Sequence, residues 1–187
     1  MKKWLIGSIV GAIIVFAWQA LSWTVLGIHE SGMKYTAAQT DIMTALNTGL
    51  TEDGVYMLPS APTSKERENM MKSLEGKPWA SIIYHKQMKT DMVMPMIRGF
   101  LVDIFLVISL IYLFTRGGAI PIARRVFSGS VAFGLAFFLW GPYNGHIFMQ
   151  LPLDAIKGDL IDAVVAWSVC GLWLAWWLNR PAKATMN

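Results

Sequence analysis

Four stretches of this chain lack charged residues almost entirely, and they constrain its fold more than any other feature. Residues 4–28 carry no charge over 25 positions, and residues 126–143 and 163–179 are also uncharged. The stretch 99–115 is interrupted only by Asp103. Because about 20 apolar residues cross the roughly 30 Å hydrocarbon layer of a bilayer, we predict four transmembrane helices.

Where an uncharged stretch is short, its predicted span takes in flanking residues. The four spans cover residues 4–28, 94–115, 126–143 and 160–179, and residues 29–91 form an insertion between the first two. Only 15% of the chain is charged, against roughly 25% in an average soluble domain. The first apolar stretch exceeds the roughly 7–15 residues of a signal peptide, so we expect an uncleaved anchor.

The basic residues indicate the orientation in the membrane. In a four-span chain the N-terminus, the loop at 116–125 and the C-terminus lie on one side. These segments hold seven basic residues and no acid, namely Lys2, Lys3, Arg116, Arg124, Arg125, Arg180 and Lys183. The positive-inside rule therefore predicts that both termini are cytoplasmic and that residues 29–91 are extracytoplasmic.

The insertion has signals for a small α+β domain. Apolar residues at helical spacing predict a helix over 36–50, and 54–59 and 79–85 have strand composition. Thr63 and Glu66 form a capping-box pattern that opens a second helix, which we expect to end near Gly76. The predicted fold class is therefore mainly α: a four-helix transmembrane bundle with a small α+β extracytoplasmic insertion between spans 1 and 2.

Asp103 is an acid inside a predicted span. It precedes Arg116 by 13 residues, which at 1.5 Å each puts it about 20 Å from the inner charged ring, near mid-bilayer. An acid at that depth is costly and needs a polar partner or a proton. Gln19 and Ser168 lie at a similar depth and are the expected hydrogen-bond partners. One hypothesis is a neutral acid that joins helices; the other is a proton or ion relay. Asp162, nearer the outer boundary, is expected to be solvated or interfacial.

Methionine and histidine residues gather in the predicted outer segments. Thioether and imidazole groups suit Cu(I), so a copper site at His85, Met88, Met92 and His146 is one alternative. The other is that these methionines are apolar filler at helix ends and that the histidines are interfacial without a ligand. We expect the second, and thus no cofactor. The sole cysteine, Cys170, excludes a disulfide within one chain.

Small residues recur at a spacing that lets transmembrane helices approach closely. Gly7 and Gly11 have it in the first span, and Ser130 and Gly134 have it in the third. These faces serve either packing within the bundle or contact with another membrane chain. We expect other membrane subunits or further copies of this chain as partners, besides the lipid bilayer, and no nucleic acid.

Several phrases also resemble a known group of proteins. They are Trp18-Gln-Ala-Leu-Ser-Trp23, Glu52-Asp-Gly-Val-Tyr-Met-Leu-Pro59, Gly76-Lys-Pro-Trp-Ala80 and Ile161-Asp-Ala-Val-Val-Ala-Trp167. Together they resemble a group of small four-span membrane proteins of Gram-negative bacteria to which no activity is assigned. The resemblance covers nearly the whole chain. It implies a multi-pass protein of the bacterial inner membrane and no particular chemistry.

The sequence contains no common catalytic motif. A Walker loop, a G-x-S-x-G elbow, an H-E-x-x-H pair and a dinucleotide fingerprint are all missing, so we expect no enzyme. The expected function is a non-catalytic accessory or scaffold subunit of a larger membrane complex. Two alternatives remain: a copper-handling protein that uses the methionine and histidine cluster, and a small transporter or proton-conducting unit that uses Asp103.

Overall fold

The computed structural model describes residues 2–116 and 120–180. It is mainly helical and divides into two compact units. One unit comprises Met1–Lys34 and Asp91–Asn187, and the other comprises Tyr35–Thr90. They are called the bundle and the insertion below, and each is described by itself.

Four helices of the described residues are long and apolar enough to cross a membrane. They are α1 (Lys2–Thr24), α4 (Val93–Thr115), the continuous helical stretch Ile122–Met149 and α7 (Leu153–Asn179). The third stretch consists of α5 (Ile122–Phe138), a π-helical segment η2 (Leu139–Tyr143) and α6 (Asn144–Met149). The chain is thus a multi-pass membrane protein.

Two of the four helices start well before the predicted spans. The third begins at Ile122 instead of 126, and α7 begins at Leu153 instead of 160. These first turns contain charged residues such as Arg124 and Lys157, which end an apolar stretch without ending a helix, since helical hydrogen bonds involve only the backbone. At the other end of the first span, α1 stops at Thr24, and Gly27 turns the chain with a φ of 60°.

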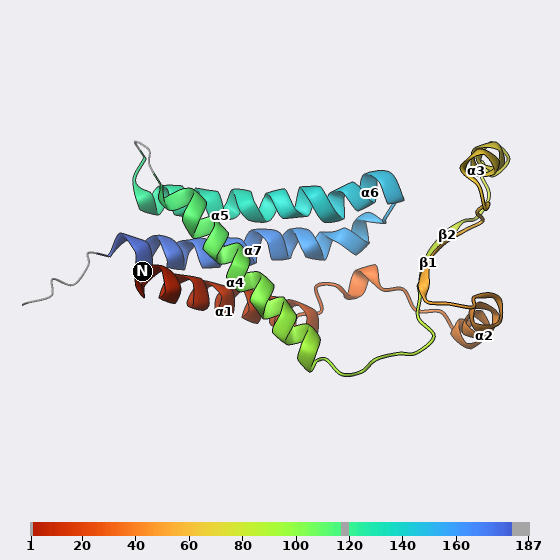
Figure 1. Cartoon of the computed structure of the whole chain (residues 1–187), viewed down its shortest axis with the longest axis horizontal. Coiled ribbons are helices and arrows are strands. Elements are labelled where there is room, and N and C mark those ends of the chain that lie inside the picture. The colour runs from red at the N-terminus through yellow and green to blue at the C-terminus, as the bar shows by residue number, and fades with distance from the viewer. Residues whose placement is uncertain (1, 117–119, 181–187) are drawn as a thin grey trace, which may run out of the picture. The chain divides into compact units, whose positions relative to one another are not determined.

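Helix α7 lies at the centre of the bundle, packed against both α1 and α5. In Figure 1, α1, α5 and α7 run side by side, and α4 crosses them obliquely. The main core lies where α1, α4 and α7 meet. Its fully buried side chains include Val15, Val107, Leu110, Ile111, Cys170 and Leu174.

The small-residue faces lie inside this bundle. A Cβ at Gly11 would lie 2.8 Å from Val107 and 3.3 Å from Cys170 Sγ, so α1 approaches α4 and α7 closely there. Gly7 faces Ile111 and Leu174 in the same way. On the other side of α7, Gly134 lies directly against Trp167, and Ser130 against Gly171. Both patterns therefore supply close helix contacts within one chain.

The insertion holds two helices and a two-stranded sheet. Strand β1 (Gly54–Leu58) pairs antiparallel with β2 (Ala80–Tyr84), with Tyr56 opposite Ile82. The helices are α2 (Gln39–Gly49) and α3 (Ser64–Met71). The capping box of Thr63 and Glu66 is confirmed, with both reciprocal hydrogen bonds present. The second helix ends at Met71, before the predicted Gly76.

Candidate functional site

The bundle contains a cavity of about 540 Å³ between its four long helices. Each helix contributes to the lining: Phe16 and Gln19 from α1, Asp103 and Leu106 from α4, Phe138 from α5, and Trp167 from α7. This volume lies within the range of roughly 300–1,000 Å³ that is usual for small-molecule sites.

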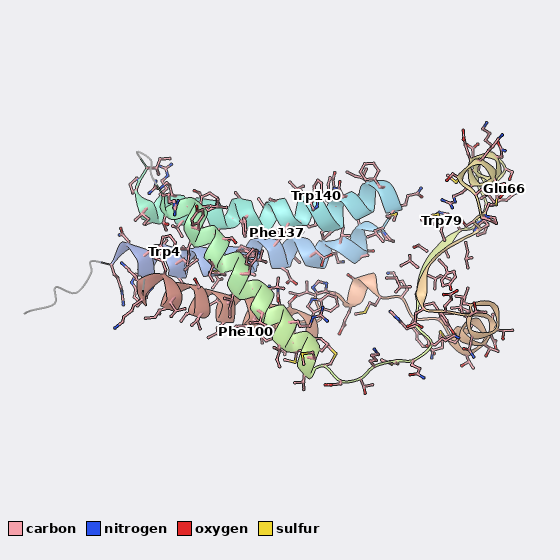
Figure 2. All side chains as sticks on the ribbon, viewed as in Figure 1. Trp4, Glu66, Trp79, Phe100, Phe137 and Trp140 are labelled. Atoms are coloured by element: carbon pink, nitrogen blue, oxygen red, sulfur yellow. The ribbon has the colours of Figure 1, made fainter. Side chains whose placement is uncertain are left out.

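Aromatic side chains form much of the cavity wall. Phe137 and Phe138 come from α5, Phe16 from α1, and Trp23 from the end of α1. The Trp167 ring lies 5.9 Å from that of Phe137, which is labelled in Figure 2, and both line the cavity. Trp167 is held in place because it packs over Gly134, where no side chain intervenes. Trp167 is therefore a buried and fixed part of the wall, whereas Phe137 and Trp23 are exposed.

Asp103 is the most deeply buried acid of this wall, with 4% of its surface exposed. Among the described residues nothing hydrogen-bonds its Oδ2 atom. Gln19, one of its two expected partners, lines the same cavity, whereas Ser168 does not. Successive helix residues point about 100° apart, so that Trp167 faces the cavity and Ser168 does not. A buried polar atom without a partner is rare and calls for a ligand, an ion or water.

A second acid of the wall, Asp162, is fully engaged in hydrogen bonds. Trp18 Nε1 donates to Asp162 Oδ1 at 2.9 Å, and His29 Nε2 lies 3.0 Å from Asp162 Oδ2. A carboxylate can only accept, so the His29 nitrogen is the donor of this pair. Trp23 stacks on the His29 ring with centroids 3.9 Å apart, and it also lines the cavity.

The backbone of α7 makes room for this histidine at Gly158. A Cβ there would lie 2.6 Å from His29 Nδ1, so any larger residue would push the ring away from Asp162. The short helix η1 (Glu30–Gly32) continues the contact, because Gly32 lies against the backbone of Ala155. The segment after α1, residues 29–32, thus packs against α7.

The structure shows a contact between Asp162 and His29 that the sequence did not predict. Asp162 was expected to be solvated or interfacial and His29 to be interfacial without a ligand; the two are bonded to each other, and His29 is 7% exposed. Their depth in the membrane stays a prediction. Trp18 was not predicted as a site residue. Asp159, which also lines the cavity, was not predicted either. The sequence contained only a weak indication of this contact. Trp18, His29 and Asp162 all belong to the predicted outer side, but they are not linked by any spacing typical of a motif.

The four residues of the copper alternative belong to different units. His85 and Met88 lie in the insertion, and Met92 and His146 lie in the bundle. Met88 is 91% exposed, His146 Nδ1 bonds to the Leu151 carbonyl at 2.6 Å, and Met92 lines the cavity. The described residues hold no group of three or more His, Cys, Asp or Glu side chains that could bind a metal. Copper binding through thioethers stays the untested alternative to the expected packing role.

His85 has its own carboxylate partner in the insertion. Asp53 accepts the Lys86 backbone N–H at 3.0 Å and lies 3.2 Å from His85 Nδ1. The Lys86 N–H bond, followed by the His85 bond, lowers the pKa of Asp53 below its ordinary value. This pair is exposed to solvent and joins the end of β2 to the start of β1.

The cavity wall is mostly apolar and carries acids but no bases. Three carboxylates, Asp103, Asp159 and Asp162, line it together with aromatic rings, and its lining includes no Lys, Arg or His. Carboxylates and aromatic faces both attract cations. The fold and site define a multi-pass membrane protein with an acidic cavity inside its helix bundle. No protein-family model, curated protein or solved structure matches this chain.

Proposed function

We propose that this protein is a small cation-binding unit of a membrane transport system, and that its bundle binds an amphipathic organic cation. The observation that supports this most is Asp103, a buried acid with a free oxygen on a cavity whose lining has no basic residue. Acids inside transmembrane segments commonly mark substrate or ion pathways.

The groups that line the cavity favour an organic cation over a bare metal ion. Asp103 comes from α4, whereas Asp159 and Asp162 come from neighbouring turns of α7, and the described residues bring no three acids together as a metal site. The aromatic side chains Phe16, Trp23, Phe137, Phe138 and Trp167 supply apolar surface and ring faces. A cation with aromatic or aliphatic substituents would satisfy both the carboxylates and these walls.

The charge distribution supports a location and an access route. With seven basic residues and no acid on one side, we place the protein in the bacterial inner membrane with both termini in the cytoplasm. The cavity is lined by Thr24 near the end of α1, Met96 near the start of α4 and Asp159 in the early turns of α7. In this orientation all three lie toward the outer side, so the cation enters from there.

The accessory-subunit function expected from the sequence remains a second proposal. It has no specific site, whereas the cavity gives the small-transporter alternative a defined volume and named carboxylates. The two functions are also compatible, since a cation-binding bundle can belong to a larger complex. The cavity is therefore the feature to test first.

The test is binding of radiolabelled tetraphenylphosphonium, a permanent lipophilic cation, to purified full-length protein in lipid nanodiscs. Tetraphenylborate has the same shape with a negative charge and reports partition into lipid. We expect saturable binding of the cation above its uptake by protein-free nanodiscs, and no saturable binding of the anion. Equal uptake of both ions, or uptake that does not saturate, would refute the proposal.

Variants connect this binding to the cavity. Asp103→Asn should fold normally, because the amide is neutral and of the same size, and should weaken cation binding at least about tenfold, the loss of one buried charge contact. The matched control is Asp154→Asn, which removes an exposed acid on α7 that pairs with Lys157 and does not line the cavity. Asp154→Asn should bind as the unaltered protein does.

A further inference from the structure

We infer that the cavity exchanges a proton for its cation, and that Asp103 is the group that releases the proton. The inference rests on the proposed cation-binding function and adds how that site is regulated. It follows from the different surroundings of two acids on one cavity wall, Asp103 and Asp162.

Asp162 has hydrogen-bond donors within the protein, without any ligand. Each of its oxygens accepts a hydrogen bond from a ring N–H, one from Trp18 and one from His29. These donors replace the water that a carboxylate would otherwise need. Asp103 has no such donors: its Oδ2 is buried without a partner in the described part of the chain. A buried acid without donors or a counter-charge takes up a proton to become neutral.

The groups that face Asp103 from the neighbouring helices favour this neutral form. Helix α1 presents Gln19, which is uncharged, and the α5 residues on the cavity are Gly134, Phe137 and Phe138. Helix α7 presents Asp159 and Asp162 on the cavity and the buried thiol of Cys170 nearby. His29, a basic group beside Asp162, is already bonded to it. Nothing among these residues supplies a positive charge to Asp103.

A bound cation would supply that charge. When the cation enters, the O–H bond of the Asp103 carboxyl group breaks, the proton leaves to water, and the carboxylate pairs with the cation. One positive charge replaces another, so the net charge of the cavity is the same before and after. Exchange thereby avoids adding net charge to a low-dielectric region, which is the costly step for any site within a bilayer.

The exchange has a measurable stoichiometry because tetraphenylphosphonium carries no proton of its own. Full-length protein in nanodiscs, in weakly buffered solution near pH 6, is mixed with the cation while a pH indicator records proton release. We expect about one proton released for each cation bound, and an affinity that rises up to about tenfold per pH unit while Asp103 is protonated. Saturable binding with no proton release and no pH dependence would overturn the inference and leave the cation site standing.

Two variants identify the source of the proton. Asp103→Asn, measured at cation concentrations that restore occupancy, should bind without releasing a proton and with an affinity independent of pH. Asp154→Asn should release as many protons as the unaltered protein. Proton release that persists in Asp103→Asn would assign it to the Asp162–His29 pair or to Asp159, and the inference about Asp103 would be wrong. Absence of any saturable binding would instead refute the proposed function itself.

Discussion

His29 and Asp162 lie 133 positions apart in the chain, and His29 Nε2 is 3.0 Å from Asp162 Oδ2. The bond joins the segment that follows α1 to the first half of α7. Since Trp23 both stacks on His29 and lines the cavity, this contact also positions part of the cavity wall.

The first prediction concerns that contact. His29→Phe keeps a ring for Trp23 to stack on but loses the hydrogen bond, and should lower the free energy of unfolding by about 1 kcal/mol, the scale of polar contacts in bilayers. Hydrogen exchange at residues 27–33 should increase. A double-mutant cycle with Asp162→Asn isolates the pair, and a coupling energy of zero would contradict the proposed role of the bond.

The second prediction concerns close packing between α5 and α7. A Cβ at Gly134 would lie 2.5 Å from Trp167 Cδ1 and would also meet the Ala163 carbonyl oxygen. Gly134→Ala should therefore destabilise the bundle by about 1–3 kcal/mol, as overpacking does. The control is Gly99→Ala, whose Cβ would meet only Phe16 at 3.9 Å. Unfolding in mixed micelles should show no loss for the control, and equal losses would contradict the packing argument.

The third prediction concerns topology. Single cysteines at the exposed positions Ser60 and Lys72 should react with a membrane-impermeant maleimide added outside intact cells. Cysteines at Gly118 and Thr185, which lie outside the residues that the structure describes, should react only after the cells are opened. The native Cys170 is fully buried and should give no background. Reaction of Gly118→Cys from outside would reverse the proposed orientation.

The fourth prediction concerns pH and the insertion. Bonds from the Lys86 N–H and from His85 lower the pKa of Asp53 in the folded protein, below its ordinary 3.8. A lowered pKa means that the Asp53 contacts stabilise the insertion above the ordinary pKa and are lost as the pH falls through the folded-state pKa. The Lys86 amide NMR signal should thus shift as the pH falls below the ordinary pKa of Asp53, when its carboxylate takes up a proton.

Two substitutions check the assignment of that titration. Asp53→Asn should abolish the acid shift of the Lys86 amide signal, whereas Glu52→Gln, at the neighbouring exposed position, should leave it in place. A shift that survives Asp53→Asn would show that another group titrates.

The fifth prediction concerns assembly. Large aromatic side chains remain exposed on the long helices, among them Phe105 at 66% and Trp140 at 82%. We expect native mass spectrometry in mild detergent to show a homo-oligomer or a complex with other membrane chains, because packing contacts hold membrane helices together. A clean monomer that retains cation binding would argue against the accessory-subunit proposal and leave the cavity function intact.

The number of long apolar helices could be predicted from the sequence because a membrane span has a minimum length and excludes charge. The helical rise predicted that Gln19 and Ser168 lie level with Asp103; Gln19 lines the same cavity as Asp103, whereas Ser168 does not. The capping box at Thr63 and Glu66 was equally local, and local patterns need no knowledge of the fold. Helix ends were less predictable, since the charges at Arg124 and Lys157 end an apolar stretch but leave the helix uninterrupted.

Only the tertiary structure decided how the helices are rotated and which residues meet across them. Rotation placed Trp167 on the cavity and Ser168 off it, and left Asp103 Oδ2 without a hydrogen-bond donor among the described residues. Helix packing also brought His29 onto Asp162, because Gly158 leaves space for the ring. A sequence determines which residues can enter a membrane and at what depth, through the free energy of transfer into lipid. Which of them become partners depends on contacts between distant segments, and no periodicity in the chain records those contacts.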